Sequence, residues 1–286
     1  MNSIIEARGL AKRYSGKQAV AGVDFRIGAG RIVGLIGRNG AGKTTVIKSI
    51  LGLTPYEGQL TVLGRDPATQ RDALMSEVSF IADVAVLPKW LKVRNALDYV
   101  AAVHPAFDRA KAEGFLATTD VKLTHKVREL SKGMVTQLHL ALVLAIKARL
   151  LVLDEPTLGL DLLVRRRFYD TLVNDYMDEE RTILVTTHQV EEIEHLLTDV
   201  LFIEQGRIVL DTPVEALGER YVQLIVKPEH LAAARSFGPF SERPIMGRTV
   251  LFYEGDLPRD QLAALGDIGT PAIADLFVAR MTREAA

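Results

Sequence analysis

The sequence lacks cysteine altogether, and aromatic residues make up only 6% of its 286 residues. The absence of cysteine excludes disulfides and thiolate chemistry and fits a reducing compartment. The longest apolar stretch, Leu138 to Ile146, is interrupted by His139 and falls far short of the roughly 20 residues that a membrane span requires. The first residues also lack the basic and apolar regions of a signal peptide. We therefore expect a soluble chain without a membrane span, so that any membrane role depends on a partner.

The chain also lacks an excess of either charge, because 35 Lys and Arg face 36 Asp and Glu, for a net charge of −1. No global field then attracts nucleic acid or anionic lipid, and nucleic acid is not an expected partner. The basic run Arg165-Arg166-Arg167 is accordingly interpreted as a solvated helix face.

The order of apolar patterns predicts an α/β protein in which strands alternate with helices. A continuous apolar run at Ile32–Ile36 ends at glycine, as in a strand buried on both faces. Helical periodicity then dominates residues 86 to 147. The alternation of strands and helices returns from 150 to about 215, with helices expected at Leu162–Met177 and Gln189–Leu197. Such alternation implies a mostly parallel sheet covered on both faces. Beyond it, strands at Tyr221–Val226 and Thr249–Tyr253 and a last helix at about 272–281 predict a small α+β appendage.

A phosphate-binding pattern, G-x-x-x-x-G-K-T, lies where the Ile32–Ile36 strand should pass into a helix. Glycine lets the backbone wrap around phosphate, with N–H groups and the helix N-terminus directed at the oxygens. Lys43 then reaches the β and γ phosphates, and the Thr44 hydroxyl ligates Mg²⁺. The expected ATP-binding residues are Gly37, Arg38, Asn39, Gly40, Ala41, Gly42, Lys43, Thr44 and Thr45.

Two carboxylates follow the apolar strand Leu150–Leu153, at the sheet edge where ligands of α/β folds bind. Asp154 is the candidate ligand for Mg²⁺, and Glu155 the candidate general base for the attacking water. The alternative, that Asp-Glu-Pro merely ends a strand, is weak beside the phosphate loop.

A third motif, Leu130-Ser131-Lys132-Gly133-Met134, opens a long apolar helix. Taken alone, Ser131 is an ordinary helix N-cap. The functional alternative is a second anion site made by the Ser131 hydroxyl, the Gly133 N–H and the helix dipole. One chain cannot bring both anion sites to one γ-phosphate, so this alternative requires two chains that meet head to tail.

With these residues the chain resembles the ATP-binding cassette (ABC) family over residues 1 to about 215. The resemblance matches Leu158 to Asp161 to the D-loop and His188 to the switch histidine that senses the γ-phosphate. It places Tyr14 on the adenine, although Tyr14 could also be an ordinary strand tyrosine. It implies a RecA-like P-loop NTPase core with an N-terminal antiparallel β portion and a helical subdomain at about 86–147. A C-terminal α+β accessory domain would then span 216–286.

The sequence departs from the family pattern at two places. In the signature, Lys132 and Met134 replace Gly and Gln. Asp83 stands where the family has the glutamine of the Q-loop, and we expect Asp83 to lie near the metal.

The LSKGM signature, Asp83 and the segment Lys126-Val127-Arg128 resemble a bacterial exporter subgroup whose ATPases pair with separate permeases. The resemblance implies a second nucleotide-binding subunit, expected to be an identical copy, and a place on the cytoplasmic face of the membrane. The segment from Pro271 to Phe277 also resembles the tail of such ATPases, although a helix docked on its own domain is the simpler interpretation. A soluble, non-transport ABC ATPase is the alternative function. A binding module without hydrolysis is a third.

Overall fold

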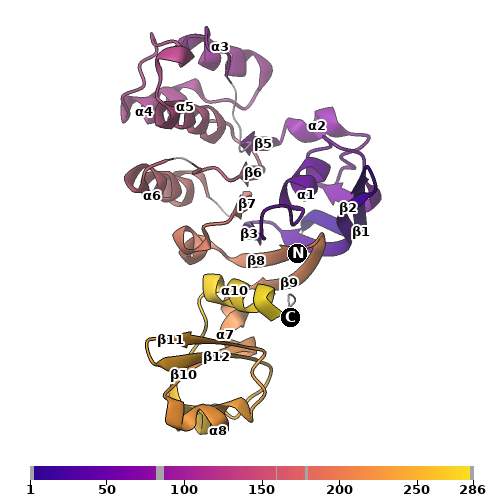
Figure 1. The fold of residues 1–286 in the computed structure, drawn as a ribbon. Coiled ribbons are helices and arrows are strands. Elements are labelled where there is room, and N and C mark those ends of the chain that lie inside the picture. Colours follow the sequence, from indigo (N-terminus) through magenta and orange to yellow (C-terminus); the bar gives the residue numbers. More distant parts are fainter. Residues whose placement is uncertain (1–2, 82–86, 159, 178–179, 284–286) are drawn as a thin grey trace.

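The computed structural model describes residues 3–81, 87–158, 160–177 and 180–283. At its centre is a six-stranded sheet in the order β5-β6-β7-β3-β8-β9 (Figure 1). Its strands are β3 (Ile32–Ile36), β5 (Val78–Ile81), β6 (Leu150–Asp154), β7 (Thr182–Thr187), β8 (Asp199–Glu204) and β9 (Arg207–Pro213). The first five in the sheet are parallel, and β9 returns antiparallel to β8. Strands β3, β6 and β7 are buried along their whole length, which explains their uninterrupted apolar runs.

The register of the parallel strands decides which side chains meet at the sheet edge. Asp154 of β6 lies opposite Thr186 of β7, and Thr187 lies opposite Ile36 of β3. The carboxyl ends of these three strands therefore coincide, at the edge where ligands bind in open α/β sheets.

A second, antiparallel sheet has the order β2-β1-β4. It consists of β1 (Ser3–Tyr14), β2 (Lys17–Gly28) and β4 (Glu57–Val62), and it is joined to β5 through α2 (Arg71–Met75). Helix α1 (Lys43–Ile50) lies between the two sheets, because Val46, Ile47 and Ile50 share one core with strands of both. This packing fixes the start of α1 relative to the edge of the central sheet.

The helical part has a core of its own, and two of its residues, Leu140 and Leu144, also pack in the core of the central sheet. It contains α3 (Val93–Val103), α4 (Arg109–Ala117), the 3₁₀ turn η1 (Val127–Glu129) and α5 (Lys132–Leu144). Asp108 caps α4 by accepting a hydrogen bond from the Lys111 N–H at 3.0 Å. The helical periodicity of this region is confirmed by these elements.

Helix α6 (Leu162–Thr171) continues into the π-helical turn η2 (Leu172–Tyr176), in the place expected for one long helix. The helix expected at Gln189–Leu197 is wrong, because this segment forms two 3₁₀ turns, η3 (Val190–Glu192) and η4 (Glu194–Leu196). Val190 and Ile193 are both buried three residues apart. A 3₁₀ helix has three residues per turn and therefore places residues at this spacing directly above one another.

The C-terminal part is an antiparallel sheet in the order β11-β12-β10-β13. Its elements, with the short helices before and after the strands, are η5 (Val214–Ala216), α7 (Leu217–Arg220), β10 (Tyr221–Val226), η6 (Pro228–His230), α8 (Leu231–Arg235), β11 (Ser241–Ile245), β12 (Arg248–Glu254), α9 (Arg259–Ala263), β13 (Gly266–Gly269) and α10 (Ile273–Arg283). Strands β10 and β12 match the sequence expectation, whereas the edge strands β11 and β13 have little β-type pattern.

Helix α10 lies between this sheet and the central sheet (Figure 1). Ala279 packs on the C-terminal sheet, while Ile273 and Leu276 join the core beneath β8. The last helix therefore contacts both parts and not its own sheet alone. Across the described ranges, no helix has the length and hydropathy of a membrane span.

Candidate active site at the edge of the central sheet

The loop from Gly37 to Gly42 joins β3 to α1 and requires glycine at two points. Gly42, the N-cap of α1, has φ of +116°, in the left-handed region that favours glycine. A Cβ there would also lie 2.5 Å from the carbonyl oxygen of Ala19. At Gly37, a Cβ would press into the carbonyl oxygen of Ile203. The loop can therefore pass this close to β8 and β2 only without side chains.

Lys43, the first residue of α1, is 6% exposed. Its Nζ donates to the carbonyl oxygen of Gly37 at 2.6 Å and lies 3.9 Å from Glu155 Oε1. Burial lowers the pKa of the Lys43 ammonium, and the nearby carboxylates of Glu155 and Asp154 partly oppose that change. The ammonium group of Lys43 thus lies between the Gly37 carbonyl and the carboxylate of Glu155.

Asp154 ends β6 and is 4% exposed. Its Oδ1 accepts a hydrogen bond of 2.6 Å from the Thr186 hydroxyl on the neighbouring strand. This bond fixes the carboxylate with one oxygen engaged and leaves the second available to a ligand.

Glu155 has an uncommon backbone conformation for a residue with a side chain, with φ of +48°. Such strain costs on the order of 1–3 kcal/mol and is concentrated at functional sites. It persists here because the Glu155 N–H donates to the backbone and side-chain oxygens of Thr186, each at 3.2 Å. The resulting turn directs the carboxylate back over the sheet edge.

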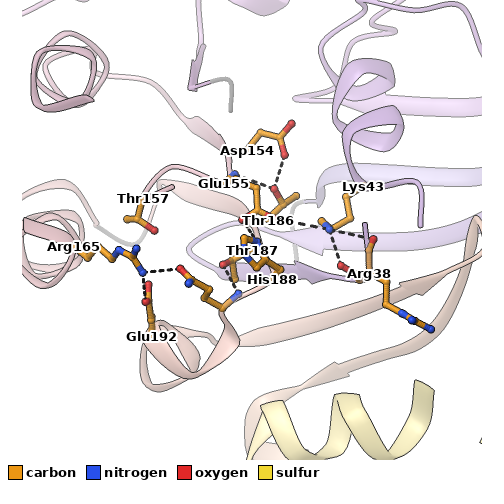
Figure 2. A network of polar contacts seen from close by, with 12 residues as sticks. Arg38, Lys43, Asp154, Glu155, Thr157, Arg165, Thr186, Thr187, His188 and Glu192 are labelled. Carbon is orange, nitrogen blue, oxygen red and sulfur yellow. Dashed lines mark hydrogen bonds and ion pairs between the residues drawn. The ribbon is translucent and has the colours of Figure 1, made fainter. Parts of the chain in front are cut away.

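His188 follows β7 directly, and its Nδ1 lies 2.8 Å from Glu155 Oε2 (Figure 2). The two oxygens of Glu155 therefore face different partners, Lys43 on one side and His188 on the other. A carboxylate in this position can accept a proton from a water molecule while both neighbours hold it in place.

A hollow of about 290 Å³ opens over this group. It is lined by Arg38, Asn39, Gly40, Gly42, Lys43, Thr44, Thr45, Asp154 and Glu155, together with Lys17 and Ala19 of β2. Most of the residues expected from the phosphate-loop pattern thus face one space with both acidic residues. Lys17 was not predicted, because a lone lysine at the start of a strand matches no motif.

The other predicted site residues lie away from this hollow. Ser131 caps α5 by accepting from the Met134 N–H at 3.2 Å, and Gly133 follows in the first turn. Asp161 caps α6 through the Val164 N–H at 3.0 Å. Among the described residues of one chain, these three do not line the space beside Lys43.

Tyr14 is 43% exposed at the end of β1, with its hydroxyl 3.3 Å from that of Thr54 and the Lys12 ammonium 4.8 Å from its ring centre. It does not line the hollow. Asp83, predicted near the metal, lies outside the described residues.

The interpretation of the basic run as a solvated face is wrong for Arg165. Arg166 is exposed, as expected. The Arg165 side chain, however, is only 19% exposed, and it bonds the Leu160 carbonyl before α6 and two side chains after β7. Figure 2 shows it beside Glu192. Composition alone cannot distinguish these neighbours, since their difference depends on what α6 packs against.

Comparison with known proteins relates this geometry to a family. A family profile described as "ABC transporter" matches residues 20–158. The Nod factor export ATP-binding protein I of Sinorhizobium fredii is 30% identical, over 98% of this chain and 86% of its own length. The protein of the same name from Burkholderia thailandensis is 34% identical, over 88% and 86%. The ABC transporter ATP-binding protein YtrB of Bacillus subtilis is 28% identical over 77% and 76%.

Solved structures share the fold. An ATP-binding subunit of an ABC transporter matches with a TM-score of 0.68 and 25% identity, over 75% of this chain and 91% of its own. A dimeric ATP-binding cassette in a post-hydrolysis state with ADP and Pi matches with a TM-score of 0.64 at 18% identity, over 73% and 98%. The expected RecA-like α/β core is confirmed by these likenesses.

Proposed function

The chain belongs to the ABC transporter family as an ATP-binding subunit, and we propose that it powers export through a separate membrane-spanning permease. Family membership makes it an ATPase. The observation that carries the assignment of roles is the position of Glu155, with Lys43 3.9 Å from one carboxylate oxygen and His188 2.8 Å from the other.

In this proposal the groups at the sheet edge divide the work of hydrolysis. Lys43 and the backbone of the 37–45 loop bind the phosphates of ATP. Glu155 orients the attacking water and accepts its proton, while His188 contacts the γ-phosphate. Phosphoryl transfer depends mainly on positioning and electrostatic stabilisation. Side chains held in fixed positions around the phosphates can therefore catalyse it.

The residues present also fit Mg²⁺. Thr44 and Asp154 both line the hollow and offer a hydroxyl and a carboxylate oxygen. In the part of the chain that the structure describes, no cluster of three or more His, Cys, Asp or Glu could hold a metal. The hydroxyl of Thr44 and the carboxylate of Asp154 suit Mg²⁺, which takes one or two protein ligands and completes its shell with phosphate oxygens and water. When bound, Mg²⁺ neutralises charge on the phosphates, and Asp83 remains a further candidate ligand.

Dimerisation completes the proposed site. Ser131, Gly133 and Asp161 stand at the starts of α5 and α6, outside the hollow of their own chain. We assign them to the nucleotide of a second, identical subunit placed head to tail. The helix N-terminus at Ser131 would then face the γ-phosphate across the interface.

Export is supported by the relatives, two of which are named as Nod factor export proteins. We further propose that the subunit works at the cytoplasmic face of the membrane. The proposed division places the nucleotide-binding domain at 1–215, its helical subdomain at about 86–147 and an accessory domain at 216–286. The alternative of a soluble ATPase predicts no membrane partner. Co-purification with a multi-span protein encoded beside this gene would support the transporter, and stimulation of ATPase by that protein would separate coupling from passive binding.

The Glu155→Gln variant tests the catalytic assignment. It should bind ATP and accumulate as a dimer, while its turnover falls at least about 100-fold, because only the proton-accepting group is lost. Light scattering after size exclusion and a phosphate-release assay measure the two effects. Glu191→Gln, at an exposed residue of η3, is the matched control. Hydrolysis by Glu155→Gln at the wild-type rate would contradict the role given to Glu155.

A further inference from the structure

One guanidinium, that of Arg165 in α6, joins two loops beside the sheet edge. Its Nε donates to the carbonyl oxygen of Leu160 at 2.8 Å, and its Nη1 donates to Gln189 Oε1 at 2.7 Å. The same Nη1 also pairs with the carboxylate of Glu192. Figure 2 shows this group projecting from α6 toward the segment that follows β7.

Each loop carries a residue of the proposed site. Leu160 directly precedes Asp161, the exposed N-cap of α6 that we assign to the subunit interface. Gln189 directly follows His188, whose ring contacts Glu155. Arg165 therefore connects the interface side of the site with the side that faces the γ-phosphate.

Among the residues that the structure describes, few groups hold the side chain of His188 in place. Its side chain is 43% exposed, and its contact with Glu155 is at the ring. Two hydrogen bonds hold the residue that follows it. The Gln189 N–H donates to the Thr187 hydroxyl at 2.9 Å, and the Gln189 side-chain oxygen accepts from Arg165. The Arg165–Glu192 pair anchors the same segment one turn later, with the two side chains only 19% and 22% exposed.

The planar fork of arginine is suited to this task, because its separate N–H groups can bond three acceptors in fixed directions. A lysine at this position would keep the charge opposite Glu192, but its single ammonium on a flexible stem cannot reproduce the arrangement.

We propose that Arg165 is a positioning residue that holds His188 against Glu155 and makes that placement depend on the segment at Leu160 and Asp161. The proposal rests on the proposed function, since Asp161 acts at the interface only if two subunits meet. Contact by a second subunit at Asp161 would thereby affect the position of His188 relative to the γ-phosphate.

Steady-state kinetics of Arg165→Lys test this role. The kcat for ATP should fall about 10- to 100-fold, the range for a misplaced catalytic group, while the KM for ATP stays within about 2-fold. Arg166→Lys, the exposed neighbour in the same helix, should keep wild-type kinetics. Gln189→Ala, which leaves the Arg165–Glu192 pair intact, should lower kcat in the same direction by less.

A double-mutant comparison separates positioning from general destabilisation. If Arg165 acts through His188, adding Arg165→Lys or Gln189→Ala to His188→Ala should change kcat by less than about 2-fold. The inference would be overturned if the kcat losses of the single variants multiplied fully in the double variants. It would also be overturned if Arg165→Lys and Gln189→Ala each kept the wild-type kcat. Absence of ATPase in the wild-type protein would instead refute the proposed function, so the two failures are distinguishable.

Discussion

The hydroxyl of Thr186 donates a 2.6 Å hydrogen bond to Asp154 Oδ1 across the β6–β7 pair, in a place where both residues are buried. The same hydroxyl oxygen accepts from the Glu155 N–H at 3.2 Å. One threonine thus supports both acidic residues, although it lies 32 residues away from the first of them in the chain.

Replacement of Thr186 by valine should weaken Mg²⁺-dependent hydrolysis, because Asp154 loses its donor while the shape of the strand is kept. The buried unpaired groups should also lower the free energy of unfolding by about 1–3 kcal/mol. The apparent Mg²⁺ affinity from ATPase titrations and urea unfolding measure these effects.

Thr182→Val is the matched control, because Thr182 is also buried on β7 but bonds the Gly28 carbonyl at the opposite end of the strand. It should lose similar stability and retain the Mg²⁺ dependence. An equal change in Mg²⁺ affinity in both variants would show that Thr186 has no special role.

Helix α10 should stabilise the nucleotide-binding core and not only the C-terminal sheet. The ring of Phe277 meets that of Phe202 edge-on, with centroids 5.3 Å apart. We expect Phe277→Ala to reduce the free energy of unfolding by about 2 kcal/mol, less than a fully buried phenylalanine because Phe277 is partly exposed. Val278→Ala, on the exposed side of α10, should change it by less than about 0.5 kcal/mol. Equal losses in chemical denaturation would contradict this packing role.

Acid should destabilise the protein partly through His139. Burial in α5 lowers the pKa of His139 from 6.5 to about 4. The unfolded chain then binds a proton between these pH values that the folded chain does not bind. This contribution is therefore fully present above pH 6.5 and is lost as the pH falls toward 4, by at most about 3 kcal/mol.

Unfolding free energies of wild type and His139→Leu, measured from pH 7.5 to 4, check this dependence. The wild type should lose more stability over that range than His139→Leu, while His195→Leu, at an exposed histidine, should follow the wild type. Parallel curves for the wild type and His139→Leu would refute the assignment.

Local patterns were enough to predict most of the residues that line the hollow at the sheet edge. Gly37 to Thr44 and the Asp154-Glu155 pair each occupy consecutive residues at a strand end, so their backbone geometry depends on neighbours in the chain. The helices of the 86–147 region followed from periodicity in the same way. The weak edge strands β11 and β13 could not be predicted, since their pairing depends on β10 and β12 and not on their own residues.

The sequence by itself determined the phosphate loop, the acidic strand end and the alternation that builds a parallel sheet, because these depend on neighbours in the chain. Only the tertiary structure decided that Thr186 supports Asp154, that His188 meets Glu155 and that Arg165 turns inward while Arg166 stays exposed. These contacts join residues 24 to 33 positions apart or depend on the face that α6 buries. They are set by strand register and helix packing, which no short stretch of sequence specifies.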